Sequence, residues 1–312
     1  MRSVRVFAPA SVANFGVGFD ILGAALDGPG DVVEARLTDA PGVVLEDVSG
    51  DGGRLPREPE RNTAGVAAAA VLERFGRPGQ GIALSLEKGL PLSSGLGSSA
   101  ASAAAGAFAA AALLGGTDRL RLLSAVLRAE HAADGSWHGD NAFASLLGGL
   151  LLVPSADPEA PRAPLRLPVP ERLRLVLIHP ELELTTAEAR RALPASVPLG
   201  QHVRNAAALA ELIAALHRDD LAAVGRAMAA DDIVETARAP LVRGYAAVTG
   251  AVREAGALGC CLAGAGPSIL ALSEEGPLPE AIAAAAVQGW ASAGVAAGAR
   301  VHRVDLTGAR LL

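Results

Sequence analysis

The sequence predicts a two-domain protein of mixed α and β structure, and three observations lead to this fold class. With 312 residues and 51% hydrophobic side chains, the chain has enough material for two cores. Six prolines fall between Val153 and Glu171, where hydrophobic periodicity is lost, so we expect an interdomain linker there. Beyond it the pattern runs strand, helices, hairpin, helix and strand, the order of a ferredoxin-like α+β sandwich. The expected domains are residues 1–160 and 161–312.

The first half alternates short strands with alanine-rich helices. Alternating apolar and polar side chains predict strands, with Pro9 closing the first of them, over residues 3–8, 21–26, 31–37 and 81–87. Helical periodicity predicts helices over residues 63–75, 99–114, 117–133 and 142–147.

The same periodicities apply to the second half. They predict strands over residues 172–178, 258–262, 269–272 and 298–306. They predict a short helix that begins at residue 185 or 186. They also predict helices over residues 201–217, 219–229, 240–255 and 279–290.

Composition excludes several classes of function. The net charge is -6 without a basic block, so neither nucleic acid nor an anionic membrane is the expected partner. Cys260 and Cys261 are adjacent and would point to opposite faces of a strand, which rules out an ordinary disulfide between them. The N-terminal residues contain no long apolar stretch typical of a secretion signal, so we expect a cytoplasmic protein. Lys88 is the only lysine, which disfavours a mechanism that needs one.

The stretch from Pro91 to Ser102 has the composition of an anion-binding loop. Gly95 and Gly97 allow backbone conformations closed to other residues, and the serines that follow offer hydroxyls at the start of a helix. A helix N-terminus presents unpaired N–H groups and a positive dipole end, and phosphate is its usual guest. No lysine follows Gly97, so this is not the common P-loop. The alternative is a capped turn.

Three further stretches contain polar residues in unusual settings. The loop from Ala8 to Asp20 is rich in glycine yet apolar, which is typical of a pocket wall; an Asx turn is the alternative for Asn14 and Asp20. Glu130 falls on the apolar side of its helix, where a metal ion or an arginine would compensate its charge, unless the side chain reaches water. Residues 137–141 form a compact polar segment that could cap a helix or reach a substrate.

The order of the three glycine-rich stretches resembles that of the GHMP kinases. Residues 8–20, 91–101 and 262–268 resemble motifs one, two and three of that family. Within it, the chain looks most like the homoserine kinase branch, and the resemblance covers essentially the whole chain. It implies a two-domain fold with an N-terminal ribosomal-protein-S5-domain-2-like α/β domain that binds ATP and a C-terminal ferredoxin-like domain.

The resemblance also implies an activity and a set of site residues. The expected reaction is transfer of the γ-phosphate of ATP to the side-chain hydroxyl of L-homoserine, giving O-phospho-L-homoserine, a step toward threonine. Mg²⁺ would be held by Ser99, with Ser98 as the alternative, and by Glu130. The expected substrate-binding residues are Asn14, Asp20, His138, Asn141, Thr186, Arg190 and Arg238. The expected ATP-binding residues are Asn62, Pro91, Leu92, Ser93, Ser94, Gly95, Leu96, Gly97, Ser98, Ser99, Ala100 and Ala101.

Within that set, the resemblance also implies individual roles, and the charges of the residues suit them. Asp20 would meet the ammonium group of the substrate, and Arg190 and Arg238 its carboxylate, because a planar guanidinium suits a carboxylate. Asn141 would hold the attacking hydroxyl. Asp140 is the candidate general base, and transfer by orientation alone is the alternative. Lys88 is expected at the surface, and attraction of the nucleotide is the alternative.

Two other functions stay open at this stage. A related kinase for mevalonate-like or sugar acceptors is the nearer alternative, although such substrates would not need Asp20 beside two arginines. A binding protein without catalysis is the second, against which the retention of Ser99, Glu130 and Asn141 argues. The sequence does not determine the oligomeric state, although a homodimer is common among the relatives.

Overall fold

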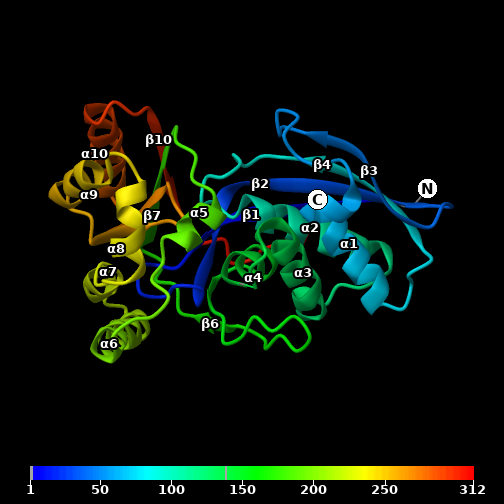
Figure 1. The fold of residues 1–312 in the computed structure, drawn as a ribbon, viewed down its shortest axis with the longest axis horizontal. Coiled ribbons are helices and arrows are strands. Elements are labelled where there is room, and N and C mark those ends of the chain that lie inside the picture. Colours follow the sequence, from blue (N-terminus) through cyan, green and yellow to red (C-terminus); the bar gives the residue numbers. More distant parts are fainter. Residues whose placement is uncertain (1–2, 138) are drawn as a thin grey trace.

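The structure is a computed structural model that describes residues 3–137 and 139–312. The first half of the chain is built around a large mixed sheet (Figure 1). The seven strands of this sheet among the described residues are β1 (Ser3–Ala13), β2 (Leu22–Thr38), β3 (Gly42–Ser49), β4 (Gly81–Glu87), β5 (Leu150–Leu152), β6 (Leu165–Leu167) and β11 (Arg310–Leu311). The strand order is β11-β1-β2-β4-β3, with β5 paired to β2 and β6 to β5. The pairing is antiparallel except between β3 and β4.

Helices gather on one side of this sheet (Figure 1). They are α1 (Thr63–Arg74), α2 (Ser98–Leu113), α3 (Leu123–Asp134) and α4 (Asp140–Leu147), with the short 3₁₀ helices η1 (Pro59–Arg61) and η2 (Arg119–Leu122). The central helix, α2, packs on β1 and β2 and against α1. Its side chains are mostly alanine and nearly all buried, because small side chains let a helix approach neighbours on every side.

The second half has the predicted ferredoxin-like arrangement. Its antiparallel sheet consists of β7 (Leu173–Pro180), β8 (Gly259–Leu262), β9 (Ile269–Glu274) and β10 (Ala297–His302), in the order β10-β7-β9-β8. The helices are α5 (Thr186–Arg191), α6 (Leu199–His217), α7 (Leu221–Met228), α8 (Val234–Arg238), α9 (Tyr245–Glu254) and α10 (Leu278–Ser292), with the 3₁₀ helix η3 (Ala239–Leu241). Cys260 and Cys261 lie on β8, buried and unbridged, and contribute to different cores.

One of the hydrophobic cores contains residues from both halves. Val12 and Leu26 from the first sheet belong to the same buried cluster as Leu175 and Leu270 from the second. The chain end also returns to the first half, where β11 pairs with β1. Because β6 pairs with β5 of the first sheet, the segment after residue 160 is partly joined to that sheet. The boundary between residues 160 and 161 stays a prediction.

Several predicted elements have different limits. β1 passes through Pro9 to Ala13, because the register with β2 shifts between Pro9 and Ser11, where a missing N–H costs no ladder bond. The two strands predicted over 21–37 are the single strand β2, and β3 was not predicted. The helix predicted over 117–133 begins as η2, and α8 was missed because it has only five residues.

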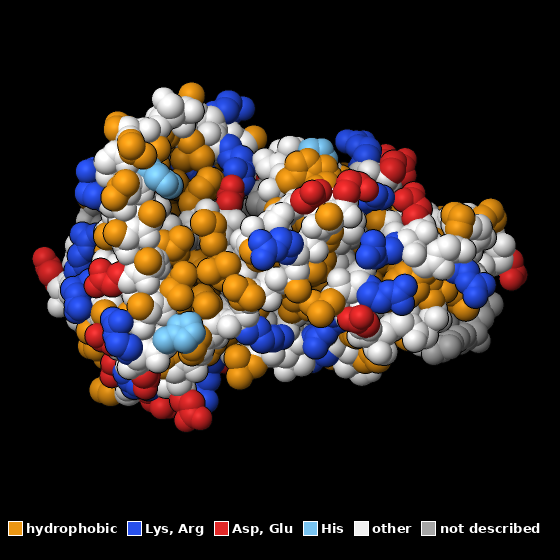
Figure 2. All heavy atoms as spheres, turned by 90° about the horizontal axis from the view of Figure 1, so that it is seen from below, with side chains coloured by type: hydrophobic (Ala, Val, Ile, Leu, Met, Phe, Trp, Pro, Cys, Tyr) orange, Lys and Arg blue, Asp and Glu red, His pale blue; other side chains and the backbone are white. Residues whose placement is uncertain are grey.

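Hydrophobic side chains are exposed on part of the surface. Seen from below, hydrophobic side chains gather over the half of the molecule that contains α6, on which Leu199 and Val203 are exposed (Figure 2). Among the described residues, none of the helices combines the length and the apolar composition needed to span a bilayer.

Candidate active site

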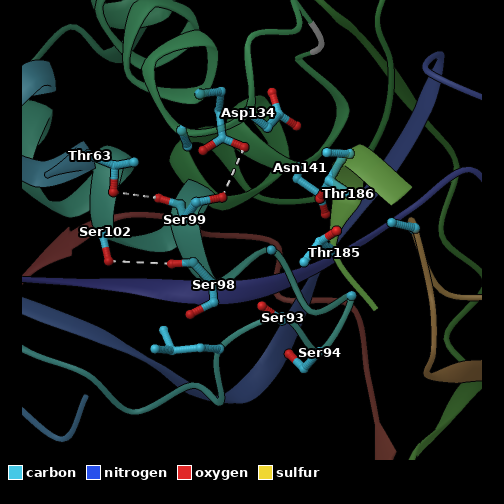
Figure 3. A pocket seen from close by; sticks show the side chains of 18 of the residues that line it. Thr63, Ser93, Ser94, Ser98, Ser99, Ser102, Asp134, Asn141, Thr185 and Thr186 are labelled. Carbon is cyan, nitrogen blue, oxygen red and sulfur yellow. Dashed lines mark hydrogen bonds between the residues drawn. The ribbon is translucent and has the colours of Figure 1, made fainter. Parts of the chain in front are cut away.

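A cavity of about 670 Å³ lies between the two halves, and its walls come from both. It collects most of the predicted site residues. Those that line it are Asn14, Asp20, Asn62, Leu92, Ser93, Ser94, Gly95, Gly97, Ser98, Ser99, Glu130, Asp140, Asn141, Thr186, Arg190 and Arg238. Figure 3 shows serine and threonine hydroxyls from α2, the preceding loop and α5 around this space. Predicted residues absent from the lining are Pro91, Leu96, Ala100 and Ala101; the last three are buried. His138 lies outside the described residues.

The loop before α2 can have only glycine at two positions. Gly95 and Gly97 have φ of 77° and 62°, and a Cβ on Gly97 would lie 2.0 Å from the Oγ atom of Ser11. Gly97 is the N-cap residue of α2, and no side chain caps this helix. The serines therefore do not act as caps, and the first amides of α2 remain available to an anion.

Glu130 reaches the start of α2 from the neighbouring helix α3. Its carboxyl Oε2 lies 3.3 Å from the Oγ atom of Ser99, and only 4% of the residue is exposed (Figure 3). Thr63 donates a hydrogen bond of 3.2 Å to the carbonyl of Ser99 from the other side. The predicted inward position of Glu130 is thus correct. Among the described residues, no group of three or more His, Cys, Asp or Glu side chains could hold a metal.

Lys88 is buried beneath the loop, so the prediction of a surface lysine is wrong. Its Nζ atom forms a short ion pair with Asp31 and donates to the carbonyl of Ser98 at 2.8 Å and to the Oγ atom of Ser102 at 2.9 Å. Burial lowers the pKa of Lys88, and the charge of Asp31 acts in the opposite direction. The lysine thereby ties the first residue of α2 to β2.

Replacing Lys88 with methionine should lower the free energy of unfolding by about 3–5 kcal/mol, because Asp31 would remain buried without its counter-charge. Urea unfolding at pH 7 measures this loss. The matched control is Arg5→Met, which breaks the exposed pair with Glu87 and should cost less than about 1 kcal/mol. Equal losses in the two variants would contradict the structural importance of the buried pair.

Opposite charges meet at the other end of the cavity. Arg190 on α5 donates two hydrogen bonds to the carboxylate of Asp20, 3.0 and 3.1 Å long. Arg238 on α8 is only 2% exposed and donates to the carbonyls of Ala189 and Gly264, both at 3.2 Å. Burial, and then the charge of Arg190, lower the pKa of Arg238. This part of the cavity thus brings the carboxylate of Asp20 together with the guanidinium groups of Arg190 and Arg238.

The first and third glycine-rich stretches are joined here. The Nδ2 atom of Asn14 donates to the carbonyl of Gly264 at 2.8 Å, and its Oδ1 atom accepts from the N–H of Asp20 at 3.1 Å. The turn interpretation of Asn14 is therefore correct in part, although the residue also lines the cavity. The Oγ atom of Ser268 donates a hydrogen bond of 2.5 Å to the carbonyl of Ser94, so the third glycine-rich stretch holds the second in place.

Asn141 and Asp140 begin α4 beside the glycine loop. The Oδ1 atom of Asn141 accepts a hydrogen bond of 2.9 Å from Ser11, and a Cβ on Gly97 would lie 3.0 Å from that oxygen. Asp140 is 2% exposed, and its Oδ1 atom accepts from the N–H of Asn141 at 2.8 Å. The N-cap of α4 is Gly139, so neither side chain caps this helix. Asn62 does cap α1, accepting from the N–H of Ala64 at 3.1 Å.

Glu235 holds α8 against the third stretch from outside the cavity. Its carboxylate accepts hydrogen bonds from the N–H of Leu262 at 2.9 Å and from the hydroxyl of Tyr245 at 2.5 Å. Burial raises the pKa of Glu235 to about 7; the charge of Asp231 adds to this effect, whereas both hydrogen bonds and Arg238 oppose it. Arg238, one turn later on α8, binds the same stretch at Gly264.

The raised pKa of Glu235 predicts a pH dependence of stability. Between pH 4.5, the ordinary value, and about 7, the folded protein holds a proton that the unfolded chain has released. The free energy of unfolding should therefore fall as pH rises through this window, by at most about 1.4 kcal/mol per pH unit from this one group. Urea unfolding of the wild type and of Glu235→Gln at pH 5, 6, 7 and 8 measures the difference. Parallel curves would rule out Glu235 as its source.

Sequence reasoning missed several residues of the cavity wall. They include Phe19, Arg54, Thr63, Asp134 and Leu184. Of these five, only Phe19 had a visible signal, because it lies inside the first glycine-rich stretch.

A second cavity, of about 690 Å³, lies beside α8 and α9. Its two carboxylates are already engaged: Asp231 accepts from three backbone N–H groups at the start of α8, and Glu235 from Leu262 and Tyr245. The first cavity is therefore the stronger candidate for chemistry.

Known proteins resemble this chain in both of its halves. The GHMP kinases N terminal domain matches residues 62–149, and the GHMP kinases C terminal domain matches residues 212–291. A homoserine kinase of Chlorobium phaeovibrioides is 43% identical over 88% of each chain, and one of Arabidopsis thaliana is 41% identical over 99% of this chain and 85% of that one. A crystal structure of homoserine kinase from Cytophaga hutchinsonii has a TM-score of 0.94 and 42% identity, covering 100% of this chain and 98% of the other.

Proposed function

Since this chain belongs to the GHMP kinase family, we propose that it is a homoserine kinase. It transfers the γ-phosphate of ATP to the side-chain hydroxyl of L-homoserine and releases O-phospho-L-homoserine and ADP, in threonine biosynthesis. The observation that carries this proposal is the cavity itself. An uncapped helix N-terminus, the carboxylate of Asp20 and the guanidinium groups of Arg190 and Arg238 line one space, which suits a phosphate donor beside a zwitterionic acceptor.

The nucleotide end is the glycine loop and the start of α2. Phosphoryl transfer requires alignment and neutralisation of charge more than covalent help from the protein. The first amides of α2 and the hydroxyls of Ser98 and Ser99 surround the phosphates, and Lys88 holds the Ser98 carbonyl in place. The lysine thus acts on the position of the loop. Asn62 is the residue we propose near the nucleobase.

Mg²⁺ fits the pair formed by Ser99 and Glu130. A hydroxyl and a carboxylate 3.3 Å apart offer two oxygen ligands, and Mg²⁺ takes few protein ligands while it keeps water and phosphate in its other positions. When bound there, the ion would neutralise charge on the phosphates of ATP. Ser99 and Glu130 belong to α2 and α3, whose packing holds the two oxygens together.

The acceptor end binds both charges of homoserine. Asp20 receives the ammonium group, and Arg190 and Arg238 receive the carboxylate. Asn141 lies beside the glycine loop and lines the same cavity as Thr186, so we propose that its amide orients the attacking hydroxyl toward the γ-phosphate. Asp140 is the candidate to accept the hydroxyl proton, and a phosphate oxygen is the alternative acceptor.

Release of ADP with a panel of acceptors tests this proposal. The panel contains L-homoserine, L-threonine, L-serine and mevalonate, each with ATP and Mg²⁺. We expect L-homoserine to have the highest kcat/KM, because it alone combines a zwitterion with a primary hydroxyl at the required distance. Turnover of mevalonate but not of L-homoserine would instead indicate a related kinase. No turnover of any acceptor would favour a binding protein without catalysis.

A further inference from the structure

The ring of Phe19 lies close to the guanidinium groups of both Arg190 and Arg238. The Cζ atom of Arg190 is 5.5 Å from the centroid of this ring, and that of Arg238 is 5.0 Å from it. Phe19 belongs to the loop between β1 and β2, whereas the arginines come from α5 and α8. Three segments distant in sequence therefore converge on one aromatic side chain that also lines the cavity.

Two guanidinium groups so close together repel each other. Asp20 compensates Arg190 directly, through two hydrogen bonds. Arg238 donates its hydrogen bonds to neutral backbone carbonyls and is almost completely buried, while Asp20, Glu235 and Asp140 act on its charge without a direct hydrogen bond. The face of an aromatic ring carries partial negative charge and attracts a cation within about 6 Å of its centroid. Phe19 thus offsets part of the repulsion and favours particular orientations of both guanidinium planes.

The backbone around Phe19 is held in place. A Cβ on Gly18 would lie 2.5 Å from the side chain of Leu22 and 2.7 Å from the carbonyl of Asn14, so the chain is closely packed there. On the other side, the N–H of Asp20 is bound by Asn14. Because both neighbours are fixed, the ring is a firm support for the arginines.

We propose that Phe19 is a positioning residue for the acceptor, whose ring orients Arg190 and Arg238 to receive the substrate carboxylate. This inference rests on the proposed function of the cavity. It adds to that function a residue that neither carries charge nor forms a hydrogen bond through its side chain. The consequence is a specific kinetic effect: Phe19 determines affinity for the amino acid and leaves the nucleotide end unaffected.

The first test compares substitutions of this ring. Phe19→Leu should raise KM for L-homoserine about tenfold, with kcat and KM for ATP within about twofold of wild type. Phe19→Tyr, which keeps the ring, should stay close to wild type. The matched control is Phe7→Leu, because Arg310 lies 4.4 Å from the centroid of that ring in β1, away from the cavity. An equal rise in KM for both substrates would overturn the proposal.

A second test keeps the shape of the ring and changes only its charge distribution. Phenylalanine analogues with one, two and three fluorine atoms, placed at position 19, weaken the negative ring face stepwise, and KM for L-homoserine should rise with each step. This series remains informative even where the leucine variant folds poorly. A constant KM across the series, with wild-type turnover of L-homoserine, would overturn the role of Phe19 alone. A wild-type protein inactive on L-homoserine would overturn the proposed function as well.

Discussion

Replacing Glu130 with alanine should lower kcat for homoserine phosphorylation by about a hundredfold to a thousandfold. The carboxylate is buried in the cavity wall and lies beside Ser99, so its removal deletes one of the two protein oxygens proposed for Mg²⁺. Charge on the transferring phosphate would then be poorly neutralised. Steady-state rates over a range of Mg²⁺ concentrations measure both effects, and we expect half-saturation to shift to a higher concentration.

Two controls make the result for Glu130 specific. Glu73→Ala removes an exposed carboxylate that pairs with Arg128 on the surface, and its rates should equal those of the wild type. Circular dichroism of Glu130→Ala should show an intact fold. If the variant keeps the wild-type dependence on Mg²⁺, the metal is held elsewhere and the assignment of Ser99 and Glu130 must be withdrawn.

Replacing Arg190 with alanine should raise KM for L-homoserine by about a hundredfold and change KM for ATP by less than about threefold. The loss of a hydrogen-bonded charge partner in a partly buried site typically costs about 2–5 kcal/mol, because the opposing charge is left unpaired. Here the substitution removes a ligand of the substrate carboxylate and also leaves Asp20 without its partner. Initial rates with each substrate varied in turn separate the two constants.

The neighbouring residue is the matched control for Arg190. Arg191 is exposed on the same short helix, so Arg191→Ala should leave both constants unchanged. A larger rise in KM for ATP than for L-homoserine in Arg190→Ala would place this arginine at the nucleotide end. At the proposed site, homoserine would have to exchange contacts with the existing ion pair of Asp20 and Arg190 as it binds.

Local sequence determined much of the fold of this protein. Gly95 and Gly97 indicated the loop before α2, since their positive φ angles and close contacts exclude other residues. The order of strands and helices predicted the ferredoxin-like half, because the periodicities of helix and strand are properties of short segments. The inward position of Glu130 followed from the same periodicity.

Other features depended on residues far apart in the chain. β3 was missed because it pairs in parallel with a strand reached only after α1, and Pro9 did not end β1 because a register shift accommodates it. The partner of Lys88 is 57 residues away, and the partner of Arg190 is 170 residues away. No local pattern encodes these pairs.

The sequence by itself therefore determined the family, the glycine loop before α2 and many of the residues that line the cavity. Tertiary structure decided that Lys88 is buried, that Asp20 and Arg190 bind each other, and that Phe19 meets two arginines. The physical reason is that backbone conformation depends on near neighbours, whereas burial and charge pairing depend on which segments the completed fold brings together.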